Sequence, residues 1–206
     1  MLLAAHNGKM DAPPVPRFSP EDYLEFDRKS ERKFEYLDGV IIAMAGGSPR
    51  HGMLAMRAAV LMGPAILANG CQPFSSDVRV LLDARRAYAY PDFSAVCGPV
   101  EYSGTAWDTI ANPALIVEVL STGTATYDTG TKASLYHAIP SLQDLLLIHQ
   151  EPVWIEHHSR ESPQSWRIDI IQDPAATIHL RSLDYTLSVA EIYSGAEAVS
   201  SQAPRD

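Results

Sequence analysis

The sequence is short of positive charge. Its 206 residues hold 16 Lys and Arg against 25 Asp and Glu, a formal net charge of −9. This balance counts against broad electrostatic binding to nucleic acid, which relies on clustered Lys and Arg. A local patch can suffice, and Arg28, Lys29, Arg32 and Lys33 form one candidate. The alternative for these four residues is a solvated helix end whose cations favour the helix dipole.

Cysteine and long apolar runs are also scarce. Cys71 and Cys97 lack the spacing of a zinc knuckle or a redox pair, so we interpret them as small buried apolar residues. Nothing here demands an oxidising compartment, so we expect a cytoplasmic protein. The N-terminus lacks the basic start and apolar run of a signal peptide. No stretch approaches the ~20 apolar residues of a membrane span, so we expect no membrane partner.

Several catalytic motifs are missing from the sequence. It has no Gly-x-Ser-x-Gly elbow and no phosphate-binding Gly-rich loop. Its seven histidines have no metal-ligand spacing, which argues against a His-based zinc site. The length suits one domain, which we place at residues 18–195, after a flexible leader (1–17) and before a disordered tail (196–206).

The first half of the domain predicts two helices and a hairpin. Ser19 caps a helix that fades near Ser30. Residues 34–45 predict a hairpin around Asp38-Gly39, a strong turn signal. A helix capped by Ser48 should then run to Ala68. Its apolar residues cover most of its circumference, so we expect it to lie deep against a sheet.

The second half predicts an α/β fold with a mixed β-sheet flanked by helices. Four strands are expected, with a helix (126–138) between the third and the fourth, which indicates a parallel crossover. Three alternating strands and a short helix should follow, as an antiparallel C-terminal extension. The expected strands are 76–82, 90–96, 114–120, 145–149, 153–157, 166–171 and 177–180, and the last helix is 188–193.

Two acids stand in apolar strands. Asp92 follows Pro91 at the start of one, and Glu118 interrupts the run Leu115–Leu120. A buried carboxylate is costly unless it is paired or coordinates a cation, so the alternative for Glu118 is a structural pair with Arg or backbone. On neighbouring strands the two acids would form a hard-oxygen pocket that suits Mg²⁺ or Mn²⁺. The carbonyl of Val119 could add a ligand.

Two further residues have two interpretations each. Lys132 shares a helix face with Asp128 and Tyr136, and either forms an exposed pair with Asp128 or reaches the metal site. Glu35 points away from its aromatic neighbours by strand alternation, and is either a solvent-facing residue or a third acid of the site. His51 could contact phosphate or lie on the surface.

A resemblance supports the metal interpretation. The segments 34–39, 90–94, 117–121 and 127–132, followed by 135–142, resemble the Uma2 family in content and order. The resemblance covers roughly residues 18–195, nearly the whole chain. That family looks like a branch of the PD-(D/E)xK nucleases. The resemblance therefore implies a restriction-endonuclease-like fold and a metal-dependent endonuclease.

The resemblance also implies roles for the candidate residues. Asp92 is similar to the family's first metal-binding Asp, and Glu118 matches the acid of the second half-motif. Position 120 is Leu instead of Lys, and Lys132 looks like the replacement, while Glu35 matches an acid on a preceding element. The implied catalytic set is Asp92, Glu118, Lys132 and Glu35, with one or two Mg²⁺ or Mn²⁺ ions. The implied substrate is nucleic acid, and we expect DNA.

Other functions are compatible with the same residues. The acidic charge and the missing in-motif lysine would suit a catalytically degenerate module that binds nucleic acid or protein. A small-molecule phosphodiesterase would have a narrow pocket without a basic rim. A homodimer would supply the two sites that cutting both strands requires, and two-fold dimers are the commonest soluble assembly.

Overall fold

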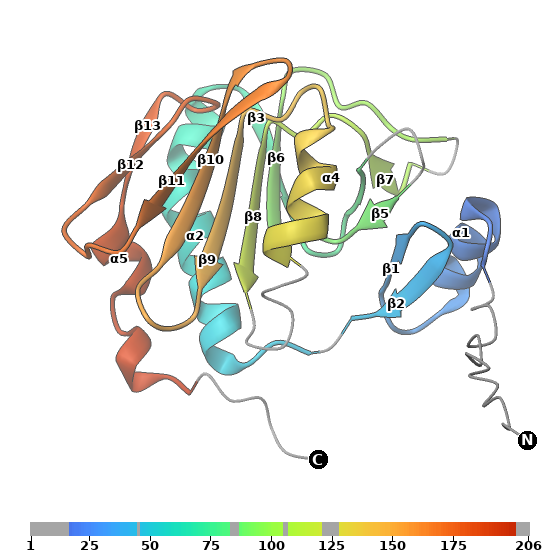
Figure 1. The fold of residues 1–206 in the computed structure, drawn as a ribbon, viewed down its shortest axis with the longest axis horizontal. Coiled ribbons are helices and arrows are strands. Elements are labelled where there is room, and N and C mark those ends of the chain that lie inside the picture. Colours follow the sequence, from blue (N-terminus) through green and yellow to red (C-terminus); the bar gives the residue numbers. More distant parts are fainter. Residues whose placement is uncertain (1–16, 45, 83–86, 105–106, 121–127, 201–206) are drawn as a thin grey trace, which may run out of the picture.

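The computed structural model describes residues 17–44, 46–82, 87–104, 107–120 and 128–200, apart from the side chains of residues 128 and 129. Its main element is a six-stranded mixed sheet with the strand order β11-β10-β9-β8-β6-β3 (Figure 1). β8 runs parallel to β9, and the other neighbours are antiparallel. The strands are β3 (Cys71–Ser75), β6 (Phe93–Cys97), β8 (Leu115–Leu120), β9 (Asp144–His149), β10 (Ile155–Ser162) and β11 (Ser165–Ile171). The expected α/β fold with an antiparallel extension is confirmed.

Helices cover both faces of this sheet. Alternate residues of β8 point to opposite faces, where Val117 packs in one core with α2 (Pro49–Ala68) and Ile116 in another with α4 (Ala133–His137). A π-helical turn, Asp128–Lys132, leads directly into α4. All six residues of β8 are buried, as expected for a strand covered on both faces.

The burial of α2 is one-sided. Leu54, Ala58, Met62 and Ile66 recur every four residues and are fully buried. On the outer face, Met56, Val60 and Leu67 are exposed, so the expectation of a deeply buried helix was wrong for that face. By length and composition α2 could also cross a membrane, contrary to the sequence-based expectation, but a core helix passes the same test.

A second, five-stranded sheet holds the N-terminal hairpin. Its order is β2-β1-β5-β4-β7. Asp38 and Gly39 both have positive φ in the tight turn of this hairpin, which confirms the prediction. α1 (Pro20–Lys29) packs beside it, with Ser19 forming the N-terminal capping box. The strands are β1 (Phe34–Leu37), β2 (Val40–Ala43), β4 (Arg79–Leu81), β5 (Tyr88–Ala89) and β7 (Thr109–Ile110).

The C-terminal segment departs from the prediction in two respects. β12 (Thr177–Leu180) pairs with β13 (Tyr185–Ser188) in a separate two-stranded sheet, followed by α5 (Val189–Tyr193). The tail expected to be disordered from residue 196 begins with a 3-10 helix, Ala196–Ala198, and the N–H of Arg50 donates to the Ser200 carbonyl at 3.0 Å. Residues 201–206 and the expected leader up to residue 16 lie outside the described residues.

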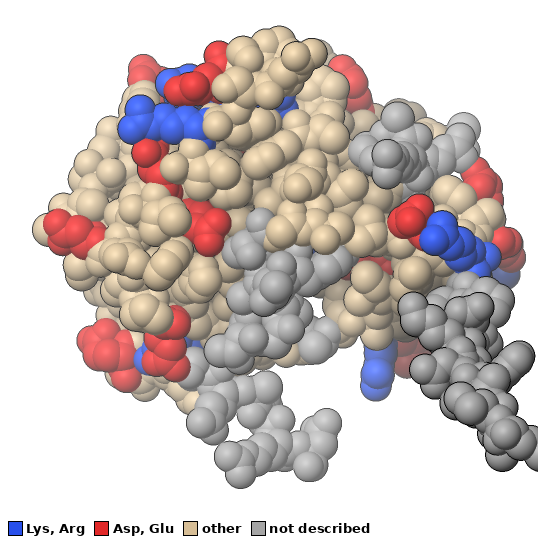
Figure 2. Space-filling model, viewed as in Figure 1, with Lys and Arg blue, Asp and Glu red and all other residues tan. Residues whose placement is uncertain are grey.

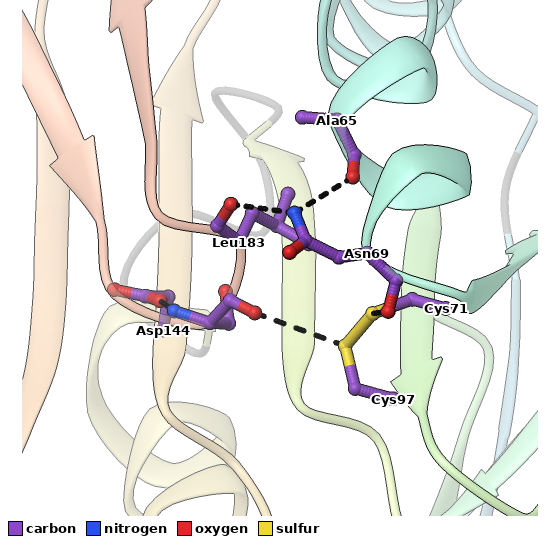
Figure 3. The surroundings of a disulfide bond; sticks show 7 residues. Ala65, Asn69, Cys71, Cys97, Asp144 and Leu183 are labelled. Carbon is purple, nitrogen blue, oxygen red and sulfur yellow. Dashed lines mark hydrogen bonds between the residues drawn. A yellow bond between two sulfur atoms is a disulfide. The ribbon is translucent and has the colours of Figure 1, made fainter.

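The two cysteines form a disulfide. Cys71 and Cys97 are partners on the adjacent strands β3 and β6, with 4.1 Å between their Cα atoms. Beside the bond, Asn69 ends α2 and donates to the carbonyls of Ala65 and Leu183 (Figure 3). The prediction of small buried apolar residues is confirmed for the burial of Cys71 and wrong for Cys97, which is exposed. The disulfide itself was not predicted, because strand pairing brings together residues that are 26 positions apart.

Candidate active site

The site lies where the two large sheets meet. The segment Tyr90-Pro91-Asp92 connects β5 of the five-stranded sheet with β6 of the six-stranded sheet. Glu118 on β8 and Glu35 on β1 therefore approach one another from different sheets. Asp92 immediately precedes β6. The expected strand 90–96 had placed it within a strand, whereas the structure places it just before the first strand residue.

Lys132 joins the two glutamates. Its Nζ lies 2.8 Å from Glu118 Oε1 and 2.7 Å from Glu35 Oε1, and its side chain is 6% exposed. Lys132 is therefore not exposed, as the pair with Asp128 would have had it, and the side chain of Asp128 lies outside the described residues. Tyr136, one turn further along, donates its hydroxyl to the same Glu118 oxygen.

Glu35 faces the site and not solvent. It is buried, and the N–H of Tyr90 donates to its Oε1 at 3.3 Å. Strand alternation keeps it opposite Phe34 and Tyr36, and Tyr36 packs in a separate aromatic cluster with Tyr23. The sequence left this residue with two equal interpretations, and its burial and its contact with Lys132 decide between them.

Asp92 is held at both carboxylate oxygens. The N–H of Val119 donates to Oδ2 at 2.8 Å, and His51 Nε2 lies 2.8 Å from Oδ1. In a strand, the N–H and C=O of one residue point to the same edge. The Val119 carbonyl therefore lies on the edge of β8 that faces Asp92.

Negative charge exceeds positive charge at the site. Burial raises the pKa of Glu118 to about 7, against the opposing attraction of Lys132; the carboxylates of Asp92 and Glu35 raise it further. A single lysine among three acids leaves uncompensated charge, which a cation would relieve.

The donor set fits a hard divalent cation. Mg²⁺ is commonly bound through one or two carboxylates and keeps several waters. Asp92 and Glu118 with the Val119 carbonyl provide such oxygens. Among the described residues, no group of three or more His, Cys, Asp and Glu side chains could hold a metal ion, so the candidate set consists of two carboxylates and a backbone oxygen.

Sequence reasoning missed two contacts. Tyr136 had a signal, because it lies four residues after Lys132, but its bond to Glu118 was not foreseen. For His51, the only signal in the sequence was its position near the start of a helix, which did not indicate a contact with Asp92. At the end of β8, Gln150 donates from Nε2 to the Leu120 carbonyl at 3.0 Å.

The proposed basic patch is largely neutralised. Arg28, Lys29 and Lys33 lie 2.7, 2.5 and 2.5 Å from the carboxylates of Asp108, Glu25 and Asp77. On the face drawn in Figure 2, Lys and Arg lie beside Asp and Glu. The helix-end interpretation fits this arrangement better than a phosphate-binding surface.

A mixed sheet with acids on neighbouring elements and a nearby lysine defines the restriction-endonuclease-like class. The chain belongs to the Uma2 family, whose model, described as "Putative restriction endonuclease", matches residues 20–190. Family and fold support a nuclease-like function.

Three similar proteins accompany this match. Uncharacterized protein slr1290 of Synechocystis sp. is 34% identical over 182 residues, covering 88% of this chain and 94% of its own. Uncharacterized protein sll1609 of the same organism is 31% identical over 157 residues, covering 76% and 89%. A crystal structure titled as a putative nuclease belonging to DUF820, from Anabaena variabilis, superposes with a TM-score of 0.71 at 17% identity, covering 87% of this chain and 99% of that one.

Proposed function

We propose that this protein is an endonuclease that uses Mg²⁺ or Mn²⁺ to hydrolyse phosphodiester bonds of nucleic acid, with DNA as the expected substrate. The observation that carries the proposal is the buried Lys132, which bridges Glu118 and Glu35 within reach of Asp92's charge. A buried ammonium at the centre of an acid cluster is costly to maintain for stability alone.

The metal ligands would be Asp92, Glu118 and the Val119 carbonyl. Lys132 and Tyr136 both contact Oε1 of Glu118, so we assign Oε2 to the ion. When bound, the ion would lower the pKa of a water and polarise the phosphate. Lys132 would stabilise the negative charge that grows on the phosphate oxygens, and Glu35 would hold the lysine in place.

The test is cleavage of supercoiled plasmid and of labelled single-stranded DNA and RNA. We expect nicking with Mg²⁺ or Mn²⁺, none with chelator, and none with Asp92→Asn. The substrate panel separates DNA from RNA preference. A wild-type protein that binds Mn²⁺ but cuts no substrate of the panel would contradict the catalytic proposal.

The second candidate is a binding module whose catalysis has degenerated. Leu120 in place of the in-motif lysine favours it. Such a module would retain nucleic acid in a mobility-shift assay with chelator present and cut nothing with metal.

We extend the proposal to a two-fold dimer of this chain. Its support is the outer face of α2, where Met56, Val60 and Leu67 are 64, 65 and 66% exposed and carry no charge. A contact without charge on this face would add no repulsion between copies that each carry a net charge of −9. Sedimentation should give a dimer for the wild type and a monomer for Val60→Glu; a monomeric wild type would remove this part of the proposal.

A further inference from the structure

Among the described residues, His51 is the contact to Asp92 that comes from a helix. Its ring belongs to the first turn of α2 and is 20% exposed, and Nε2 lies 2.8 Å from Asp92 Oδ1. Because an ionised carboxylate only accepts hydrogen bonds, Nε2 carries the proton. Two carboxylate oxygens have about four acceptor positions. His51 and the Val119 N–H use one on each oxygen, which leaves a position on each for an ion.

The place of the ring depends on Gly47. A Cβ atom at Gly47 would lie 2.8 Å from His51 Cδ2 and 3.0 Å from Cγ, closer than real Cβ contacts. A Cβ atom at the adjacent Gly46 would meet nothing within 4 Å. Neither glycine has a positive φ, so alanine suits the backbone of both. Only Gly47 therefore supplies space that the ring needs.

A chain of hydrogen bonds ties this turn to β8. The His51 N–H donates to Ser48 Oγ at 3.1 Å, and Ser48 Oγ donates to Gln150 Oε1 at 2.6 Å. Gln150 Nε2 then donates to the Leu120 carbonyl at 3.0 Å. Ser48 and Gln150 are both buried. The start of α2 is thus fixed relative to the strand that carries Glu118 and Val119.

We propose that the Gly47–His51 turn is a positioning element that holds Asp92 in the orientation required to bind the divalent cation. This rests on the proposed function, because the ion is the one assigned to Asp92 and Glu118. His51 does not contact the ion. It acts through Asp92, and Gly47 acts through His51.

The test measures Mn²⁺ binding to the full chain by calorimetry, without reference to cleavage. We expect His51→Ala and Gly47→Ala each to weaken Mn²⁺ affinity by about 10- to 100-fold, the usual effect of removing a residue that orients a metal ligand. His51→Gln should recover most of the affinity, because the amide nitrogen of Gln can occupy the place of Nε2. Gly46→Ala is the matched control and should bind as the wild type does.

Thermal unfolding of each variant shows whether it is folded. If His51→Ala fails to fold, Gly47→Ala still tests the proposal, because it retains the histidine. Unchanged affinity in both His51→Ala and Gly47→Ala would overturn the positioning role alone. Equal losses in Gly46→Ala and Gly47→Ala would assign the effect to the loop and overturn it as well. A wild type that binds no Mn²⁺ would overturn both this role and the metal-dependent function.

Discussion

Among the described residues, two clusters that are each built around a buried cation, Arg79 or Lys132, are balanced differently. In the first, Arg79 is 2% exposed, and its guanidinium lies 2.5 Å from Asp27 and 2.8 Å from Asp108. Arg28 also contacts Asp108, at 2.7 Å. Two guanidinium groups thus face two carboxylates. In the second cluster, Lys132 faces the three acids of the candidate site.

The pKa shifts follow this balance. Burial alone would raise the pKa of Asp108, but hydrogen bonds and charge from Arg28 and Arg79 outweigh it and lower the pKa to about 2. For Glu118, burial dominates and Lys132 does not compensate. The excess negative charge of the second cluster is what the proposed cation would neutralise.

The largest effect should come from breaking the balanced cluster. Arg79→Met leaves Asp27, 3% exposed, without its buried counter-ion, and we expect a loss of about 3–5 kcal/mol in the free energy of unfolding. Urea denaturation measures it. Arg167→Met is the control, since Arg167 pairs with Asp169 at the surface. A loss no larger than that of the control would mean that the Arg79 cluster contributes nothing to stability.

Removing the ammonium group of Lys132 should mainly affect turnover. Lys132→Ala should lower the cleavage rate by roughly 10²-fold or more, the range for losing one electrostatic donor. Because Lys132 is buried between two carboxylates, the metal-free Lys132→Ala variant should also be less stable than the wild type. The loss of an exposed lysine would have little effect on stability. Single-turnover rates and urea denaturation separate the two effects. Full activity in Lys132→Ala would leave the reaction without an assigned cation.

The pH dependence of stability should differ between the clusters. The folded pKa of Glu118 is raised from 4.5 to about 7, so its contribution is fully present below 4.5 and is lost as pH rises through about 7. The folded pKa of Asp108 is depressed from 3.8, so its contribution is present above 3.8 and is lost as pH falls through about 2.

Glu118→Gln tests this difference in chelator-treated protein. The variant should lack the loss of stability between pH 4.5 and 7, and saturating Mn²⁺ should suppress that loss in the wild type. Urea midpoints over a pH series give the result. Parallel curves for variant and wild type would show that Glu118 does not titrate in this range.

The smallest effect should come from an exposed ion pair. Lys29 and Glu25 are four residues apart on α1, and 2.5 Å separates Lys29 Nζ from Glu25 Oε1. Their side chains are 73 and 69% exposed. Lys29→Ala should change the free energy of unfolding by about 0.5 kcal/mol or less, because solvent screens the pair. A loss comparable to that of Arg79→Met would mean that burial does not explain the large contribution expected of the Arg79 cluster.

Much of the fold was predictable because its signals are local. Caps at Ser19 and Ser48, the turn at Asp38-Gly39 and the apolar run of β8 are each decided by a few neighbouring residues. The short strands β5 and β7 were missed, since two residues, such as Tyr88–Ala89, carry no periodicity. The second sheet could not be predicted, because its order depends on pairings between distant segments.

By itself, the sequence determined that Asp92 and Glu118 are anomalous in their apolar surroundings, and that Lys132 and Tyr136 share one helix face. Only the tertiary structure decided which groups meet. It turned Glu35 toward Lys132, placed His51 against Asp92 and joined Cys71 to Cys97. The physical reason is that chemical type and spacing are local properties, whereas contact between side chains of different sheets and helices depends on how the whole core packs.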